Sequence, residues 1–282
     1  MKDQVTPTVA MAGATAGLGR ATVPLLAGRG AHLVLLARNI DKAAVVANEA
    51  RQAGASQVHV VECDLSLGSS VRHAAAELAA RGIVPNVIVN DAAVATPTRT
   101  VTAEGSELML ATNYLGPCLL TRLILADLPD GSSVRLISVG GPLDAKPDLD
   151  DLDSEHSFAF MKAFERSKTA LNLFTVAVPR HVHAVDVHVA IYSPGLMKTG
   201  LSATMAGALA RVAEKVAGLV LANPAEAAAG LANLILSTDL GGTAPGTLFD
   251  RHGKATPMPL IHDIDLQEAL WQLTSQRLGM DA

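Results

Sequence analysis

The sequence contains few aromatic residues, almost no cysteine and little net charge. Phe, Trp and Tyr make up 3% of the 282 residues, and Cys63 and Cys118 are its two cysteines. Two thiols inside apolar stretches do not indicate a disulfide scaffold, so we expect a protein of the reducing cytoplasm. The formal net charge of −5 argues against a general affinity for nucleic acids or acidic membranes.

Long hydrophobic runs are also missing near the N-terminus. The opening stretch, MKDQVTPTVAMAGATAG, has one short apolar run that leads directly into glycines. Such a run is too short to cross a bilayer and lacks a signal-peptide cleavage pattern, so we expect neither. Apolar residues nevertheless form 49% of the chain, which is enough to bury a sizeable core.

Apolar runs alternate with helical stretches along most of the chain. The runs are nearly continuous in Val, Ile and Leu, as in parallel strands that helices cover on both faces. We therefore predict an α/β fold, a doubly wound parallel sheet of the Rossmann type, formed by a single domain over 1–282. Predicted strands are 8–14, 32–38, 58–64, 87–91, 133–140, 186–193 and 247–250, and predicted helices are about 18–29, 41–53 and 68–82.

Two further segments are assigned from composition. The acidic stretch 144–156 is predicted to be an exposed loop before a long helix. The stretch 199–219, rich in small residues, is predicted to be a mobile helical flap over a substrate site.

Glycines cluster between the first predicted strand and the first predicted helix. Gly13, Gly17 and Gly19 stand in the stretch AGATAGLGR. Glycines at this point let the backbone approach a pyrophosphate, and the following helix offers free N–H groups. The sequence therefore predicts a dinucleotide site, with a purely structural turn as the alternative. The loop residues expected to contact the cofactor are Gly13, Thr15, Ala16, Gly17, Leu18 and Gly19.

A basic residue follows the second predicted strand. An acidic residue there would bind a ribose 2′-hydroxyl, whereas the guanidinium of Arg38 can pair with a 2′-phosphate. Arg38 therefore favours NADP over NAD, unless it simply extends into solvent. Arg20, in the first helical turn, is a weaker candidate for the same role.

With these motifs in view, the chain resembles the short-chain dehydrogenase/reductase family over about 13–250, and within it the branch of retinol dehydrogenases and protochlorophyllide reductases. The stretches ATNYLGPCLLT, SKTALNLFT and SPGLMKTGL carry the likeness to that branch. The resemblance implies that Asp64 and Leu65 flank the adenine. It also implies that NDAA is an altered Asn-Asn-Ala-Gly segment, with Asn90 and Ala92 beside the ribose and Asp91 and Ala93 departing from the pattern.

The resemblance also assigns residues around the nicotinamide. Asn113 matches the asparagine that holds an active-site water, and Lys168 matches the lysine that binds the nicotinamide ribose. A loop after the sixth strand would hold the carboxamide, and its matching residues are Pro194, Gly195, Met197 and Thr199.

Two positions depart from the family pattern. The catalytic serine that would bond the substrate carbonyl corresponds to Gly141, and the catalytic tyrosine corresponds to Phe164, four residues before Lys168. Hydride transfer depends mainly on positioning, while proton donation typically contributes a separate factor of roughly 10²–10⁴. A reductase without both side chains is therefore physically allowed for a ketone that is already activated.

Other side chains are candidates to replace the missing pair. Ser138 could line the pocket, although a core serine is the alternative, and Tyr192 could supply a phenol, although a packed aromatic is the alternative. Lys162 and Glu165 lie beside Phe164 in sequence, and His156 stands in the acidic loop.

A crowded group of His181, His183, Asp186 and His188 raises the question of a metal. Because the segment is predicted to be a loop that leads into a buried strand, without helical histidine spacing, we expect solvated histidines and no metal.

Two classes of function remain. The first is an NADPH-dependent ketoreductase acting without the usual Tyr acid, similar to atypical reductases of aromatic polyketide antibiotic pathways, whose small-molecule substrate would be aromatic and polycyclic. The second is a catalytically inactive NADP-binding regulator or scaffold. An epimerase or dehydratase that uses transient hydride transfer is a third option. The sequence leaves the oligomeric state open.

Overall fold

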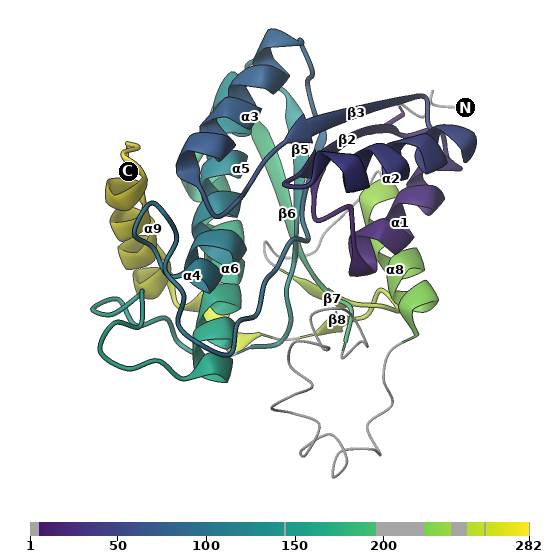
Figure 1. Ribbon diagram of the computed structural model, residues 1–282. Coiled ribbons are helices and arrows are strands. Elements are labelled where there is room, and N and C mark those ends of the chain that lie inside the picture. The colour runs from purple at the N-terminus through teal and green to yellow at the C-terminus, as the bar shows by residue number, and fades with distance from the viewer. Residues whose placement is uncertain (1–5, 144, 196–222, 238–246, 257, 282) are drawn as a thin grey trace.

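The computed structural model describes residues 6–143, 145–195, 223–237, 247–256 and 258–281. The described strands form one eight-stranded sheet in the order β3-β2-β1-β4-β5-β6-β7-β8 (Figure 1). All neighbouring strands are parallel except β7 and β8, which are antiparallel. The predicted single Rossmann-type α/β domain is confirmed.

The strands follow the apolar runs of the sequence closely. They are β1 Thr8–Ala12, β2 His32–Ala37, β3 Gln57–Glu62, β4 Val87–Asn90, β5 Ser133–Val139, β6 Asp186–Ser193, β7 Leu248–Asp250 and β8 Ala255–Thr256. The central strands are buried along nearly their whole length, because helices cover both faces of the sheet. Each of the seven predicted strands is confirmed to within two residues at either end.

The helices lie in layers on the two faces of the sheet (Figure 1). On one face are α1 Gly17–Ala27, α2 Ile40–Gln52 and α8 Pro224–Leu236. On the other are α3 Gly68–Ala80, α5 Gly116–Asp127 and the long α6 Phe160–His181. Shorter segments are α4 Leu108–Leu110, the π-helical turn η1 Ala111–Leu115 and the 3₁₀ turn η2 Pro259–His262, and the last described helix is α9 Ile264–Leu278.

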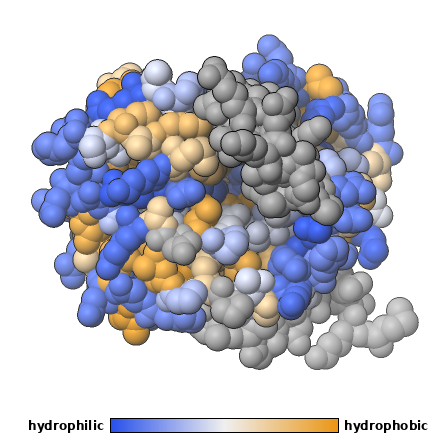
Figure 2. All heavy atoms as spheres, turned by 90° about the horizontal axis from the view of Figure 1, so that it is seen from below, coloured by the Kyte–Doolittle hydropathy of each residue, from blue (hydrophilic) through white to orange (hydrophobic). Residues whose placement is uncertain are grey.

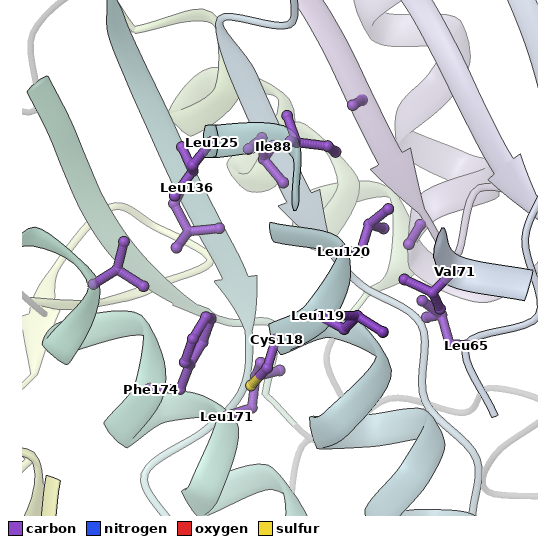
Figure 3. Packing of buried hydrophobic residues seen from close by; sticks show 14 of the residues in the cluster. Leu65, Val71, Ile88, Cys118, Leu119, Leu120, Leu125, Leu136, Leu171 and Phe174 are labelled. Carbon is purple, nitrogen blue, oxygen red and sulfur yellow. The ribbon is translucent and has the colours of Figure 1, made fainter. Parts of the chain in front are cut away.

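The larger part of the core lies between the sheet and the α3, α5 and α6 layer. Figure 3 shows Cys118 of α5 lying close to Leu171 and Phe174 of α6. Cys118 is completely buried, and burial raises the pKa of its thiol well above the ordinary value. Cys118 therefore acts as a small apolar core residue rather than a nucleophile.

The helical stretch Leu108–Asp127 is long and apolar enough to cross a membrane by length and composition alone. Its 18-residue window has a mean hydropathy of 1.4, and 83% of that window is buried inside the protein. Packing in the core therefore accounts for its apolar character, and the match is weak support for a membrane span.

The last helix, α9, packs outside α6 as an additional layer (Figure 1). Trp271 stacks on Phe174 with ring centroids 5.5 Å apart and on His181 with centroids 4.0 Å apart. The guanidinium of Arg122 lies 4.6 Å from the centre of the Trp271 ring. Through these contacts the Trp271 side chain packs the C-terminal helix against α5 and α6. No local sequence pattern indicates them.

Candidate active site

The glycine loop between β1 and α1 lies directly against the segment that follows β4. Gly13 has a φ of +103°, and a Cβ there would stand 2.5 Å from the backbone nitrogen of Ala92. A Cβ at Gly19 would stand 2.6 Å from a carboxylate oxygen of Asp91 and from the carbonyl oxygen of Gly13. Only glycine fits these two positions, because the loop packs closely against the segment after β4. The predicted approach of this loop to a pyrophosphate stays a prediction.

The N-terminus of α1 has no side-chain cap, and in its first turn the N–H of Gly19 donates to the Asp91 carboxylate. The N-cap residue Ala16 offers no side-chain hydrogen bond, and no acidic residue stands in the first turn. Ala16 and Gly17 are exposed, Thr15 is half-buried and Leu18 packs into the core. Exposed N–H groups with the positive end of a helix dipole form an anion site, as a pyrophosphate requires.

The site lies where the strand order reverses. β1 pairs with β2 on one side and with β4 on the other, and β4 continues to β5. Ligands of open α/β sheets bind beyond the carboxyl ends of the strands at such a point. Figure 2 views the molecule from below, where hydrophilic and hydrophobic groups are interspersed over the surface that is not drawn in grey.

The two basic candidates for a 2′-phosphate have different surroundings. Arg38 is exposed immediately after β2, and it has no hydrogen bond or ion pair with any described residue. Arg20 forms an ion pair with Glu49 of α2 at 2.8 Å, which ties its guanidinium to the helix surface. Arg38 therefore remains the better candidate for the ribose end of the cofactor.

The residues expected beside the adenine and ribose differ in what their side chains do. One carboxylate oxygen of Asp64 accepts from the backbone and hydroxyl of Ser66, and Leu65 is buried. The Asn90 amide donates to Thr121 of α5, so this side chain points into the core. At Asn90 only the backbone is therefore left to contact a ribose. The backbone N–H of Ala92 donates a hydrogen bond of 3.1 Å to the carbonyl oxygen of Ala12.

Asn113 lies in the π-helical turn η1 and is completely buried. Its side-chain oxygen accepts from Val94 N at 2.7 Å, and its amide donates to Val94 O at 2.9 Å. The same amide donates to the hydroxyl of Ser167 on α6 at 3.1 Å. The Asn113 side chain thus joins the loop after β4 to the helix that carries Lys168.

Lys168 and Asp91 form the electrostatic centre of the site. Burial lowers the pKa of the Lys168 ammonium to about 8, and the charge of Asp91 opposes this shift. Burial raises the pKa of the Asp91 carboxyl to about 7, against the opposing effects of Lys168 and the N–H of Gly19. In the sequence Asp91 is only a departure from the family pattern. Its surroundings follow from the fold, which places it against Gly19 of α1 and within electrostatic range of Lys168 of α6.

Phe164 lies one helical turn before Lys168 on α6, so both side chains belong to the same side of the helix. Gly141 follows β5, and a Cβ there would meet its nearest neighbour, Leu143, at 3.7 Å. At Gly140, by contrast, a Cβ would stand 2.3 Å from the side-chain oxygen of Asn172. The backbone thus has space for a side chain at Gly141 and none at Gly140.

The two candidate proton donors with hydroxyl groups, Ser138 and Tyr192, are buried and hydrogen-bonded in the core. Ser138 is completely buried, and its hydroxyl shares a 2.7 Å hydrogen bond with Thr175. Tyr192 is 1% exposed, and its hydroxyl donates to Ala227 O at 2.6 Å. These contacts favour the structural alternative for both residues over a role as proton donor.

The remaining candidates do not gather at the site. His156 is exposed and pairs with Asp151, and Lys162 is exposed on α6. Glu165 is half-buried on α6, and its side chain forms no hydrogen bond with a described residue.

The crowded histidines are separated by the fold. His181 belongs to the last turn of α6 rather than to the predicted loop, and it stacks on Trp271. His188 pairs with Asp186 at 2.9 Å, and His183 is exposed. Among the described residues, no group of three or more potential metal ligands is found.

The loop after β6 is described only at its start. Pro194 is half-buried and Gly195 is exposed just beyond Ser193. Met197, Thr199 and the predicted flap at 199–219 lie outside the described residues.

A doubly wound sheet with a glycine loop, an open helix N-terminus and a buried lysine defines a dinucleotide-dependent oxidoreductase. Residues 7–208 match the family described as short chain dehydrogenase, and the chain belongs to this family. The predicted NAD(P)-dependent enzyme class is thereby confirmed, because members of the family use NAD(P).

Individual relatives support the same assignment. The chain is similar to polyprenol dehydrogenase of Mus musculus, with 32% identity over 269 residues that cover 92% of this chain and 80% of that protein. It is similar to retinol dehydrogenase 14 of Mus musculus, with 30% identity over 288 residues, 97% of this chain and 86% of that protein. The expected likeness to retinol dehydrogenases is confirmed.

Among solved structures, the chain resembles the angucycline C-6 ketoreductase LanV with bound NADP. The TM-score is 0.67 at 25% identity, and the match covers 88% of this chain and 95% of that one. The fold is therefore one in which a ketoreductase has been observed with NADP.

Proposed function

We propose that this protein is an NADPH-dependent ketoreductase that acts on an activated ketone of an aromatic, polycyclic polyketide-like molecule. When bound, NADPH would supply the hydride. The observation that carries the proposal is the buried Lys168 near the switch point of the sheet, within electrostatic range of Asp91, whose carboxylate accepts from the N–H of Gly19 in the glycine loop. The proposal places the enzyme in the cytoplasm and in antibiotic biosynthesis.

The choice of NADPH rests on Arg38. Its side chain is exposed at the carboxyl end of β2, where it can pair with a 2′-phosphate, and Asn39 beside it caps α2 by accepting from Lys42 N. No acidic residue occupies positions 38 and 39 to repel that phosphate.

The choice of an activated ketone rests on Phe164 and Gly141. A benzyl group and a hydrogen atom stand where the family resemblance expects a phenol and a hydroxyl. A carbonyl that is already hydrogen-bonded to a phenol on its own ring system depends less on a tyrosine acid. The angucycline ketoreductase neighbour supports this substrate class, and the angucyclinone ketoreductase of simocyclinone biosynthesis is a protein of the type we propose.

An inactive NADP-binding regulator is the second candidate, and Phe164 with Gly141 favours it. Against it, the chain keeps Lys168 buried in the site and keeps Asn113 bonded to Val94 and Ser167. A protein that only senses NADP requires neither arrangement.

The test is NADPH consumption with a panel of substrates. The panel would contain hydroxylated polycyclic aromatic ketones and quinones, with retinal and a polyprenal to represent the retinol and polyprenol dehydrogenases. We expect oxidation of NADPH with the aromatic ketones and formation of the corresponding alcohol. Binding of NADP without consumption of NADPH by any compound would overturn the reductase proposal and favour the regulator.

The cofactor assignment has its own variant. Arg38→Ala should weaken NADPH binding at least about tenfold while leaving NADH binding nearly unchanged, because only the 2′-phosphate loses a partner. Arg20→Ala is the matched control, since its guanidinium is already paired with Glu49. Equal affinity of Arg38→Ala and the unmodified protein for NADPH would contradict the assignment.

A further inference from the structure

Asn172 is a buried polar side chain on the side of α6 that carries Phe164 and Lys168. It follows Lys168 by one helical turn, so the three residues succeed one another along the helix. Asn172 is completely buried. Buried amides normally have partners for both their nitrogen and their oxygen, so the contacts of this side chain indicate what it does.

The amide nitrogen of Asn172 binds the turn that follows β5. It donates to the carbonyl oxygen of Gly141 at 3.2 Å and to the sulfur of Met258, just before η2, at 3.8 Å. The same Gly141 carbonyl accepts from Leu143 N at 2.8 Å. Two donors therefore hold the carbonyl of the position where the family resemblance expects the catalytic serine.

A second side chain of α6 holds the same turn, residues 141–143. The hydroxyl of Thr169, the residue after Lys168, donates to Leu143 O at 3.4 Å. On the sheet side, Gly140 N donates to Tyr192 O of β6 at 2.8 Å. The turn is thus fixed between the sheet and the part of α6 that carries Lys168.

The amide oxygen of Asn172 has a steric effect on position 140. It is buried and has no hydrogen-bond donor among the described residues, which lowers stability. The three atoms nearest to a Cβ at Gly140 all belong to Asn172, and its oxygen would lie 2.3 Å away. Asn172 therefore excludes a side chain at position 140, whereas a Cβ at Gly141 would have its nearest neighbour at 3.7 Å.

We propose that Asn172 is a positioning residue of the substrate site, which keeps the carboxyl end of β5 fixed and free of side chains so that a wide, flat ketone fits there. The proposal rests on the proposed function. The amide nitrogen fixes the turn through Gly141 O, and the amide oxygen restricts position 140 to glycine. The space beside Gly141 then accepts a ring fused to the reacting carbonyl, as in a polycyclic aromatic ketone.

The first experiment removes the amide in two ways. Asn172→Ala removes both the donor and the volume of the side chain, whereas Asn172→Leu removes the donor and keeps the branched shape. Because both lose the bond to Gly141 O, we expect the KM for polycyclic aromatic ketones to rise roughly 3–10-fold in each. The value of kcat, and NADPH affinity from fluorescence titration, should change far less.

Thr274→Val on α9 is the matched control. Thr274 is buried and shares a 2.6 Å hydrogen bond with the hydroxyl of Tyr114, on the helix that packs outside α6. Valine keeps the shape and loses this buried bond, so the variant should be less stable with an unchanged KM. An unchanged KM in both Asn172 variants, or an equal rise in Thr274→Val, would overturn the proposal.

A stability measurement without ligands tests the steric part. Gly140→Ala should lower the urea midpoint of the unmodified protein, because its Cβ meets Asn172. In the Asn172→Ala background this decrease should fall by at least about half, since the two residues are in contact. In Asn172→Leu it should persist. An equal decrease in Asn172→Ala and in the unmodified protein would show that Asn172 does not restrict position 140, and the proposal would be wrong.

Ligand binding keeps this proposal separate from the reductase assignment. If no ketone is reduced, that assignment has failed, and binding of the same ketones to the NADP complex, followed by thermal shift, decides the role of Asn172. Binding that weakens in both Asn172 variants and not in Thr274→Val supports the positioning role. Binding that is equal in all the proteins, or no binding of any ketone, overturns it.

Discussion

Phe164 and Gly141 can be changed back toward the family pattern without disturbing their surroundings. The space at Gly141, where a Cβ would lie 3.7 Å from Leu143, accepts a serine, and Phe164→Tyr adds only one oxygen to a half-buried ring. We predict that the double variant Gly141→Ser, Phe164→Tyr oxidises NADPH about 10-fold faster or more with the ketones of the proposed substrate class, and that it also accepts ketones that are not activated.

Gly140→Ser is the control for this pair. Its Cβ would stand 2.3 Å from the Asn172 side-chain oxygen, so the variant should lose roughly 1–3 kcal/mol of unfolding free energy without a gain in rate. Steady-state kinetics and urea unfolding measure both effects. A double variant no faster than the unmodified enzyme on any ketone would show that proton donation at this position does not limit the reaction.

Asp91 also makes the stability of the cofactor-free protein depend on pH. Burial raises the pKa of its carboxyl to about 7, so its contribution to stability is full below the unfolded pKa and is lost as the pH rises through 7. Asp91→Asn removes this loss while keeping an oxygen that can accept from Gly19 N. We predict that, as the pH rises from 5 to 8, the unfolding free energy of the variant increases by about 1–3 kcal/mol relative to that of the unmodified protein.

Urea unfolding at a series of pH values, without cofactor, measures this difference. If the difference in unfolding free energy between the two proteins were the same at every pH, a raised pKa of the Asp91 carboxyl would be contradicted.

Among the helices, α3 depends on a side chain from another part of the chain. Its N-cap residue Leu67 provides no side-chain hydrogen bond, but the carboxylate of Glu104 accepts from Gly68 N at 2.6 Å and from Ser69 N at 3.1 Å. The Ser69 hydroxyl donates to the same carboxylate at 2.7 Å. Glu104 thus caps the first turn of α3 from a distance in sequence.

Glu104→Gln should therefore destabilise the protein by about 0.5–1 kcal/mol at pH 7. Hydrogen bonds from the Ser69 side chain and backbone lower the pKa of Glu104, so its contribution is present above the ordinary glutamate pKa and is lost as the pH falls through the lowered value. The difference in stability between Glu104→Gln and the unmodified protein should therefore decrease at acidic pH. Thermal unfolding at pH 7 and pH 3.5 tests this, with Glu62→Gln at the exposed end of β3 as the control.

One aromatic side chain makes a large contribution to the contact of the C-terminal helix α9 with α5 and α6, beside the hydrogen bonds and ion pairs of other α9 residues. Trp271 is 4% exposed and lies against Phe174, His181 and Arg122. We predict that Trp271→Ala loses about 3–5 kcal/mol of unfolding free energy. Trp271→Phe should cost much less, because the indole N–H has no hydrogen-bond partner among the described residues and no bond is lost.

Chemical denaturation of the two variants gives the comparison. If Trp271→Ala were as stable as the unmodified protein, the ring contacts of Trp271 would not contribute to the stability of the described fold.

Local patterns predict the strands, the first three helices and the glycine loop, and the family resemblance picks out Lys168. Buried parallel strands have continuous apolar runs, and a close backbone approach requires glycine, so both leave a signal within a few residues. The bounds of α8 and α9 could not be predicted, because small or mixed residues give these helices a weaker pattern.

The roles of the polar side chains, by contrast, follow from packing between distant segments. Ser138 meets Thr175, Tyr192 meets Ala227, and Asp91 lies between Gly19 and Lys168, although the members of each pair are far apart in the chain. Burial and the identity of the nearest charge set the pKa of a group, and both depend on how separate elements pack. The fold and the location of the site could thus be read from residue order, whereas the packing of β4 against α1 and α6 sets the electrostatics of the site.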